Sequence, residues 1–405
     1  MSTLPKEVLR SIIVDGGLKT SDDVHEYLKE LFKDTLQEML EAELDLKLGY
    51  EKHDRQGKET DNRRNGHTKK KVKSKYGVVD INVPRDRNGE FEPTVIPKNK
   101  RNISGIEEQI ISLYARGMST RDIHDQINDI YGIEVSAEMV SKITDKILPQ
   151  IKEWQSHPVD SMYPFVFMDA IHFKVRENNQ VVSKAAYVVL GVNKEGLKEI
   201  LGIWIGENET SKFWLSVLNS LKNRGLKEVM IFSVDGLNGF KQALEATYPN
   251  SEMQRCIIHQ IRSTLKYVPF KDRKSFAKDL KTIYQVADET KGYEALMEVS
   301  EKWGKKYPHA IRSWENNWDV LSTFFKYSQE IRKIIYTTNI IESLHRQYRK
   351  VTKTKTVFPT DESLEKILYL ASKNVSKKWS RRYDNWDIIV NQLSIIYGER
   401  FTNYL

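Results

Sequence analysis

The stretch Phe165-Val-Phe-Met-Asp-Ala-Ile-His-Phe-Lys-Val175 decides how this chain folds. Its apolar residues are typical of a buried β-strand, yet one carboxylate, Asp169, stands at its centre. A charge inside a buried strand is costly unless another group pairs with it or binds to it. Asp169 is therefore either a paired acid of the core or the first ligand of a metal site.

The residues after this stretch predict an α/β domain. Short turns join the first three strand-like runs, which indicates an antiparallel meander. A helix capped by Thr210, a parallel strand that ends at Asp235, a second helix and a short strand follow. This order is that of the ribonuclease H-like fold, whose acids lie on the first strand and at the end of the fourth, the places of Asp169 and Asp235. We expect strands at 165–175, 185–192, 199–205, 227–234 and 253–258, and helices at 210–221 and 240–246.

Glu342 is the third acid of interest because it begins a helix that continues with basic residues. Asn339 is a good N-cap three residues before it, so the pair fits a capping box as well as Glu342 fits a catalytic acid. An acid that acts on DNA needs phosphate-attracting groups beside it. The helix and the loop after it supply them as Arg346, Arg349, Lys350, Lys353 and Lys355.

Three carboxylates suit the chemistry of phosphodiester cleavage. Two Mg²⁺ ions about 3.5–4 Å apart activate the attacking oxygen and stabilise the leaving one. Mg²⁺ takes oxygen ligands and keeps some of its waters, so a few carboxylates suffice. Asp169, Asp235 and Glu342 supply them if the fold brings them together, which their wide spacing in the sequence does not itself show.

Cys256-Ile-Ile-His259 is a weak zinc motif because no second ligand pair follows at finger spacing. Cys256 is the only cysteine, which excludes an internal disulfide and suits the cytoplasm. As a nucleophile it has no support beyond being the only thiol. We expect a structural role for Cys256 and His259 at a strand end near the acids.

The first 103 residues predict helices and a basic ribbon. Residues 1–20 are expected to be a loose leader. Ser21–Leu48 has apolar residues at helical spacing, so it is either a helix packed in its own domain or a dimerisation helix. A basic run before the alternating stretch Val78–Pro84 predicts a β-ribbon. Its cations are either solvated or in contact with phosphates, and the candidates are Arg63, Arg64 and Lys69.

Residues 104–157 predict three short helices with polar turns. The pattern is typical of a helix-turn-helix module, and a plain helical bundle has the same pattern. We expect the helices at 106–115, 121–130 and 137–148, with Ser119 as N-cap of the second. The third is the expected recognition helix. It would bury Met139, Val140, Ile143 and Ile147, and present Lys142 and Lys146 to DNA.

Composition and length bound the remaining possibilities. The chain has 405 residues, enough for two or three domains, and 30% of them are charged. Its apolar runs are too short for a membrane span, and its net charge of +8 is consistent with nucleic acid as a partner. The expected fold class is multidomain α/β plus α. Its regions are 1–50 (N-terminal helical, with dimerisation as one alternative), 51–103 (basic β-ribbon), 104–157 (helix-turn-helix), 158–261 (first part of the ribonuclease H-like core), 262–330 (all-helical insertion) and 331–405 (last part of the core with C-terminal helices).

The insertion is rich in aromatic residues. We expect them in its core, with stacking of one on an unpaired base as the alternative. They are Trp303, Tyr307, Trp314, Trp318, Phe324 and Phe325.

Several motifs, in order along most of the chain, resemble the Mutator-like family of bacterial insertion-sequence transposases. They are Met168-Asp-Ala-Ile-His-Phe-Lys-Val-Arg176, Lys184-Ala-Ala-Tyr-Val-Val-Leu-Gly191, Val234-Asp-Gly-Leu-Asn-Gly-Phe240, Gln254-Arg-Cys-Ile-Ile-His-Gln-Ile-Arg262 and Tyr336-Thr-Thr-Asn-Ile-Ile-Glu-Ser-Leu344, with Arg63-Arg-Asn-Gly66 and Pro84-Arg-Asp-Arg-Asn-Gly-Glu-Phe-Glu-Pro93 before them.

The resemblance implies a DDE catalytic triad of Asp169, Asp235 and Glu342 on a ribonuclease H-like core. It also implies a Cys-x-x-His motif at Cys256 and His259, an all-helical insertion before the glutamate, and dependence on a divalent metal, Mg²⁺ with Mn²⁺ as a substitute. The reaction it implies is cutting at terminal inverted repeats followed by strand transfer, often through a circular intermediate. One departure is His345, where the family pattern has asparagine.

The expected function is therefore that of a cytoplasmic insertion-sequence transposase. It would bind terminal inverted repeats and target DNA, and it would be at least a homodimer because two DNA ends must be held together. Two alternatives remain. A structure-selective nuclease on the same fold would hydrolyse DNA without strand transfer, and a non-catalytic DNA-binding regulator would use the same acids only for structure.

Overall fold

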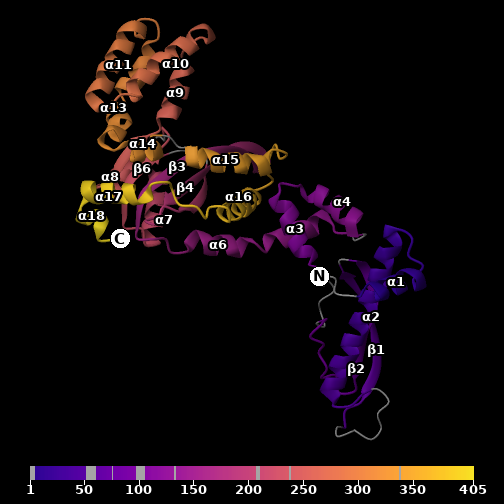
Figure 1. The fold of residues 1–405 in the computed structure, drawn as a ribbon. Coiled ribbons are helices and arrows are strands. Elements are labelled where there is room, and N and C mark those ends of the chain that lie inside the picture. The colour runs from indigo at the N-terminus through magenta and orange to yellow at the C-terminus, as the bar shows by residue number, and fades with distance from the viewer. Residues whose placement is uncertain are drawn as a thin grey trace. The chain divides into compact units, whose positions relative to one another are not determined.

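The computed structural model describes residues 5–51, 61–74, 76–96, 105–131, 134–206, 210–236, 239–336 and 339–405 (Figure 1). The chain divides into two compact units, Met1–Asp145 and Lys146–Leu405. Parts of the predicted basic run, of the boundary near residue 104 and of the motifs at 234–240 and 336–344 lie outside the described residues.

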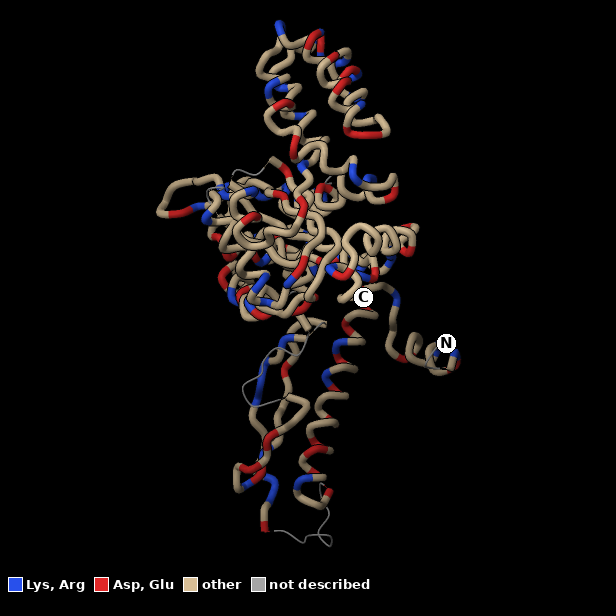
Figure 2. Tube along the Cα trace, turned by 90° about the vertical axis from the view of Figure 1, so that its left-hand side faces the viewer, with Lys and Arg blue, Asp and Glu red and all other residues tan. Residues whose placement is uncertain are grey.

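Helix α2 (Ser21–Leu48) and a two-stranded ribbon form one core of the first unit. The strands β1 (Arg64–Ser74) and β2 (Gly77–Asp86) pair antiparallel. Val79 and Ile81 of β2 alternate with exposed residues and pack against Leu36 and Leu40 of α2. A capping box at Thr20 begins α2, and both signs of charge follow its length (Figure 2). The predicted helix and ribbon are confirmed.

The prediction that residues 1–20 form a loose leader is wrong. Residues Lys6–Asp15 form helix α1, in which no residue is buried. Apolar residues recur there at helical spacing, which was a sufficient signal for a helix.

Three further helices of this unit match the three predicted from the sequence, a pattern that a helix-turn-helix module shares with a plain helical bundle. They are α3 (Ile106–Ala115), α4 (Thr120–Tyr131) and α5 (Ala137–Asp145). Ser119 Oγ accepts the backbone N–H of Asp122 at 3.1 Å, as its predicted capping role requires.

The third helix is shorter than predicted. It ends at Asp145 because Pro149 has no N–H and its ring clashes with the carbonyl of residue 145. Lys146 lies in the turn between α5 and helix α6 (Leu148–Ser156) of the second unit, so it shares no helix with Lys142. Met139, predicted to face inward, is exposed, whereas Val140, Ile143 and Ile147 are buried.

A five-stranded mixed sheet organises the second unit, in the order β5-β4-β3-β6-β7. The antiparallel meander β3–β4–β5 is confirmed, and Asn178 and Asn179 form its first turn with positive φ. Strand β6 pairs parallel with β3, and β7 pairs parallel with β6. The strands are β3 (Met162–Glu177), β4 (Gln180–Val192), β5 (Lys198–Gly206), β6 (Glu228–Val234) and β7 (Glu252–Arg255).

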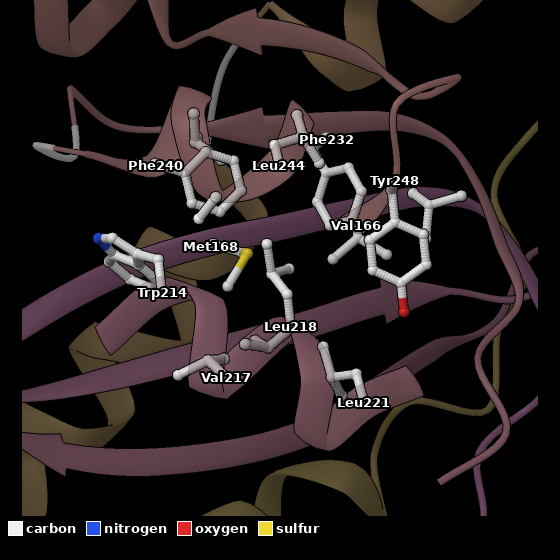
Figure 3. Close-up of a cluster of buried hydrophobic side chains, with 14 of the residues drawn as sticks. Val166, Met168, Trp214, Val217, Leu218, Leu221, Phe232, Phe240, Leu244 and Tyr248 are labelled. Carbon is white, nitrogen blue, oxygen red and sulfur yellow. The ribbon is translucent and has the colours of Figure 1, made fainter. Parts of the chain in front are cut away.

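One face of this sheet carries the main apolar cluster. Helices α7 (Ser211–Asn223) and α8 (Phe240–Thr247) cover it, and Figure 3 shows Val166 and Met168 of β3 pointing into the cluster with Trp214 of α7. Because side chains alternate along a strand, Asp169 points to the opposite face. On that side β3 packs against helix α15 (Asn339–Thr352).

The last strand was predicted at 253–258, which extends beyond the C-terminal end of the observed strand. Strand β7 stops at Arg255, and helix α9 (Ile257–Leu265) begins where residues 256–258 were expected to continue the strand. A short apolar run does not distinguish a strand from a buried helical turn, which explains the error.

The region between α9 and α15 is helical throughout its described residues, as predicted. Helices α10, α11 and α13 gather apart from the sheet (Figure 1). Of the six aromatic side chains singled out in the sequence, five are buried, which favours the core interpretation, while Trp318 is half-buried edge-on to Tyr293. The elements are α10 (Phe270–Tyr284), α11 (Glu289–Trp303), α12 (Pro308–Glu315), α13 (Trp318–Leu321), the 3₁₀ helix η1 (Ser322–Lys326) and α14 (Gln329–Ile335), followed after α15 by α16 (Asp361–Ser376), α17 (Trp386–Tyr397) and α18 (Glu399–Thr402).

Candidate active site

The three predicted acids come from three elements that meet on the α15 side of the sheet. Met168 of β3 is the register partner of Val234, the last residue of β6. Asp169 and Asp235 follow these partners, so they stand at one level on neighbouring strands, whose backbones are about 4.8 Å apart. Glu342 lies in the first turn of α15.

His259 connects two of these acids. Its Nδ1 lies 3.6 Å from Asp235 Oδ1, and its Nε2 lies 3.4 Å from Glu342 Oε1. The imidazole ring therefore stands between the two carboxylates. Burial on its own lowers the pKa of His259, but Cys256 and the carboxylates of Asp235 and Asp169 raise it to about 9. The ring is a cation at neutral pH.

Arg262 is a second cation on the same helix. It donates from Nη1 to Glu342 Oε1 at 2.5 Å and from Nη2 to Oε2 at 3.3 Å. The bidentate pair fixes the plane of the carboxylate. Glu342 thus pairs with α9, and among the described residues no hydrogen bond joins its carboxylate to the backbone N–H of Asn339, as the capping-box alternative would require.

Asp169 is the most buried of the three acids, with 5% of its surface exposed. Burial raises its pKa to about 7, and the nearby charges of Asp235 and Glu342 add to the effect, while His259 and the Ala170 N–H oppose it. Because its pKa is raised, the Asp169 carboxyl keeps its proton to a higher pH, which reduces the free-energy cost of burying a charge in this strand.

His345 lies one turn after Glu342 and faces Asp169. Its Nδ1 is 3.4 Å from Asp169 Oδ2, and both side chains are buried. Burial lowers the pKa of His345 to about 3, with further lowering by Arg349 and His259, so the ring is neutral.

Cys256 caps α9. The sulfur accepts the backbone N–H of His259 at 3.5 Å, and the thiol is buried. This contact orients the first turn of the helix that carries His259 and Arg262.

The carboxylates of Asp169, Asp235 and Glu342 are ligands of the type that a hard divalent cation takes, although in this structure they do not surround a common position. Among the described residues, no group of three or more His, Cys, Asp and Glu side chains surrounds a common position. The reason is that His259 separates Asp235 from Glu342. Three convergent carboxylates are nevertheless the ligands that Mg²⁺ prefers.

The basic residues predicted on the helix of Glu342 and in the loop after it are exposed. Arg346, Arg349, Lys350 and Lys353 all reach the surface. The last three line a cavity of about 440 Å³, whose remaining wall is Ile171, His172, Phe173 and Thr352. The cavity thus combines cations with an apolar wall that begins two residues after Asp169 on β3.

The residues of the first unit that were predicted to contact DNA differ in their exposure and in their ion pairs. Arg63 and Lys69 are exposed. Arg64 pairs with Glu41 at 2.8 Å and also with Asp45, so its charge is already neutralised by α2. Lys142 is exposed and pairs with Glu138 at 2.7 Å.

Two residues of this site were missed by sequence reasoning, Arg262 and His345. A helix begun at Ile257 would have placed His259 and Arg262 three residues apart on one face. His345 falls three residues after Glu342 and shares its face in the same way.

An α/β core with three convergent acids beside a basic helix is that of an enzyme that processes nucleic acid. A family model described as "Transposase, Mutator family" matches residues 6–382. The chain belongs to this family.

Curated relatives agree with the family. The "Probable transposase for insertion sequence element ISRM3-like" of Sinorhizobium fredii (strain NBRC 101917 / NGR234) is 42% identical over 93% of this chain and 94% of its own length. The "Transposase for insertion sequence element ISRM3" of Rhizobium meliloti (strain 1021) is similar to the same extent. The prediction of an insertion-sequence transposase is confirmed.

A solved structure is similar only weakly. A chain in the cryo-EM structure of the simian T-cell lymphotropic virus intasome in complex with PP2A regulatory subunit B56 gamma is 12% identical, with a TM-score of 0.18 over 51% of this chain and 64% of that one. Such a score carries no argument about the fold. Each helix in the described part of the chain is too short or too polar to cross a bilayer.

Proposed function

We propose that this transposase cuts and joins DNA by a DDE mechanism on a ribonuclease H-like core, with Asp169, Asp235 and Glu342 as its acids. The observation that carries the proposal is the contact of one side chain, His259, with both Asp235 and Glu342, while Asp169 stands at the register level of Asp235. The strand order and directions support the fold assignment.

The three carboxylates would hold Mg²⁺, or Mn²⁺ in its place. When bound, such ions activate an attacking oxygen and stabilise the leaving one. His259 and Arg262 neutralise Asp235 and Glu342 in the metal-free chain, so both cations must yield carboxylate oxygens to the ions.

The reaction has two steps of the same type. Water attacks the scissile phosphorus, the bond to the 3′ oxygen breaks, and a 3′-hydroxyl leaves. That hydroxyl then attacks a phosphorus of target DNA, which forms a new phosphodiester and expels the 3′ oxygen of the target strand. Arg346, Arg349 and Lys350 of α15 and Lys353 of the turn after it contact phosphates near the acids, as their exposure permits.

The remaining regions supply DNA recognition and pairing of ends. Residues 104–157 bind the terminal inverted repeats through Lys142 and Lys146, and Arg63, Arg64 and Lys69 of the ribbon contact phosphates. Because Arg64 is already paired, we expect it to contribute less than Arg63 and Lys69. The active form is at least a homodimer, since two ends must be held together.

A strand-transfer assay tests the proposal. The full-length chain is incubated with Mg²⁺, a linear fragment carrying the element's own ends, and a supercoiled target plasmid. We expect joined products, and a loss of about 10³-fold or more in Asp169→Asn, Asp235→Asn and Glu342→Gln, because each removes a ligand of the ions that stabilise charge in the transition state. Asp384→Asn, a substitution of an exposed acid in the loop before α17, is the matched control.

Two results contradict the proposal. Hydrolysis without joined products would identify a structure-selective nuclease. Undiminished transposition in cells by all three variants would identify a regulator in which the acids are structural.

A further inference from the structure

His345 and Asp169 form a buried pair that the proposed chemistry does not yet use. Asp169 Oδ1 accepts the Ala170 backbone N–H at 2.8 Å, which leaves Oδ2 as the oxygen nearest to His345 Nδ1, at 3.4 Å. Their side chains are 8% and 4% exposed, so water does not substitute for either partner. A single backbone bond fixes only one oxygen, and rotation about it remains free without a second contact.

The two ring nitrogens of His345 have different surroundings. Nδ1 faces the carboxylate, whereas Nε2 is buried and, among the described residues, has no hydrogen-bond partner. A neutral imidazole has one N–H. Metal binding requires Asp169 in its ionised form. With the proton on Nε2, the lone pair of Nδ1 would then face a carboxylate oxygen and the N–H would be unpaired. With the proton on Nδ1, the N–H faces Oδ2, which selects this tautomer.

We propose that His345 is a positioning residue whose Nδ1–H donates to Asp169 Oδ2 and fixes the rotation of that carboxylate for metal binding. The proposal rests on the DDE function proposed above. Apo hydrogen bonds in active sites are often long and tighten when the site is loaded, which suits a contact of 3.4 Å.

The arrangement also explains how the acids are set relative to one another. Glu342 and His345 lie on one helix, three residues apart and on the same face. Helix α15 therefore sets Glu342 directly and Asp169 through His345. A shift of this helix along the sheet would displace Glu342 and change the contact between His345 and Asp169 at the same time.

The alternative is that His345 only fills space beside Tyr348, whose ring lies 6.2 Å away. A positioning role and a space-filling role for His345 predict different effects when the residue is replaced. In His345→Asn the amide occupies the place of Nδ1, and in His345→Gln it occupies the place of Nε2. His345→Leu keeps apolar volume and has no donor.

Mn²⁺ titration by calorimetry on the full-length chain tests the proposal, with cleavage of element ends as a second readout. His345→Asn is expected to keep Mn²⁺ affinity within a few-fold of the unaltered chain. His345→Gln and His345→Leu are expected to weaken it about 10–100-fold, the usual effect of removing a group that orients a metal ligand. DNA affinity in chelator is expected to stay unchanged in all three.

Equal Mn²⁺ affinity in the Asn and Gln variants, or a loss in Asn as large as in Leu, overturns the proposal. If His345→Leu does not fold, the Asn and Gln pair decides alone. The variant Asp169→Asn distinguishes a failure of the proposed function from a failure of the role proposed for His345. When it binds Mn²⁺ as the unaltered chain does, the proposed function has failed; when it loses Mn²⁺ while His345→Gln keeps it, only the role of His345 has failed.

Discussion

At the scale of single residues, the site is a balance between buried acids and two cations from α9. Asp169 reaches a pKa of about 7 chiefly through burial. His259 and Arg262 hold the other two acids. In the metal-free chain the proton on Asp169 and the charge on His259 together replace the positive charge that a divalent ion would bring.

The raised pKa of Asp169 makes stability depend on pH in a defined direction. The native carboxyl binds its proton more strongly than the unfolded one, so this group destabilises the fold increasingly from about pH 4 to about pH 7 and fully above that. We expect Asp169→Asn to raise the melting temperature in chelator more at pH 8 than at pH 5. Thermal unfolding across this range is the measurement, with Asp384→Asn as control. An equal shift at both pH values would refute the assignment.

His259 has the opposite sign. Its pKa is raised from 6.5 to about 9, so its charge stabilises the native state fully below about pH 6.5 and the contribution is lost as pH rises through about 9. We expect His259→Asn to lower the unfolding free energy in chelator by about 1–3 kcal/mol at pH 6 and by much less at pH 10. Urea denaturation at both pH values checks this. A loss that does not change with pH would mean that the ring stabilises only by packing.

At the scale of elements, the strands that position the acids were predictable and one helix was not. Strand β3 was found from its apolar run, and the β3–β4 turn from Asn178 and Asn179, since two asparagines favour positive φ. The start of α9 was missed because Cys256 is an unusual N-cap and the residues after it are apolar in either structure. This one boundary hid the shared face of His259 and Arg262.

The basic face of α15 leads to a prediction about DNA affinity. Lys353, in the turn after α15, is exposed and lines the same cavity as Arg349 and Lys350. We expect Lys353→Gln to weaken binding to all DNA sequences alike and to reduce the slope of log affinity against log salt by about 1. Fluorescence anisotropy with a duplex at several salt concentrations measures both. Lys305→Gln, in the exposed turn after α11, removes the same charge elsewhere, and an equal slope change there would rule out a local contact.

At the scale of the whole molecule, no sequence pattern could show that the acids converge. Asp169, Asp235 and Glu342 meet only because β6 returns parallel to β3 and α15 comes back after a long helical region. The order of elements indicated this arrangement, while the register that aligns Met168 with Val234 depends on packing of both sheet faces. Helix α1 differs from the acids in this respect. Its apolar residues recur at helical spacing, so the local sequence alone predicts it.

Of the two alternatives for α2, packing within its own unit is observed for the second half of the helix, and dimerisation stays a prediction that we assign to the first half. Its second half packs on the ribbon through Leu36 and Leu40, and Leu44 packs beside Tyr50 and Phe91. In its first half, Val24, Leu28 and Leu31 are exposed at spacings of four and three, the seam of a helix that pairs with another. A second copy of the same helix would bury this seam, which suits a reaction that must hold two DNA ends.

We therefore expect the double variant Leu28→Lys, Leu31→Lys to convert a dimer into a monomer, because two buried charges on each chain would face their copies across the interface. Light scattering after size exclusion measures the mass. Joining of ends should be lost with the dimer, while binding of a single DNA end should persist. Leu46→Lys is the matched control, since Leu46 is 85% exposed on the same helix outside the seam. An unchanged mass in the double variant would show that the first half of α2 does not pair the chains, and the ends would then have to be held by another surface.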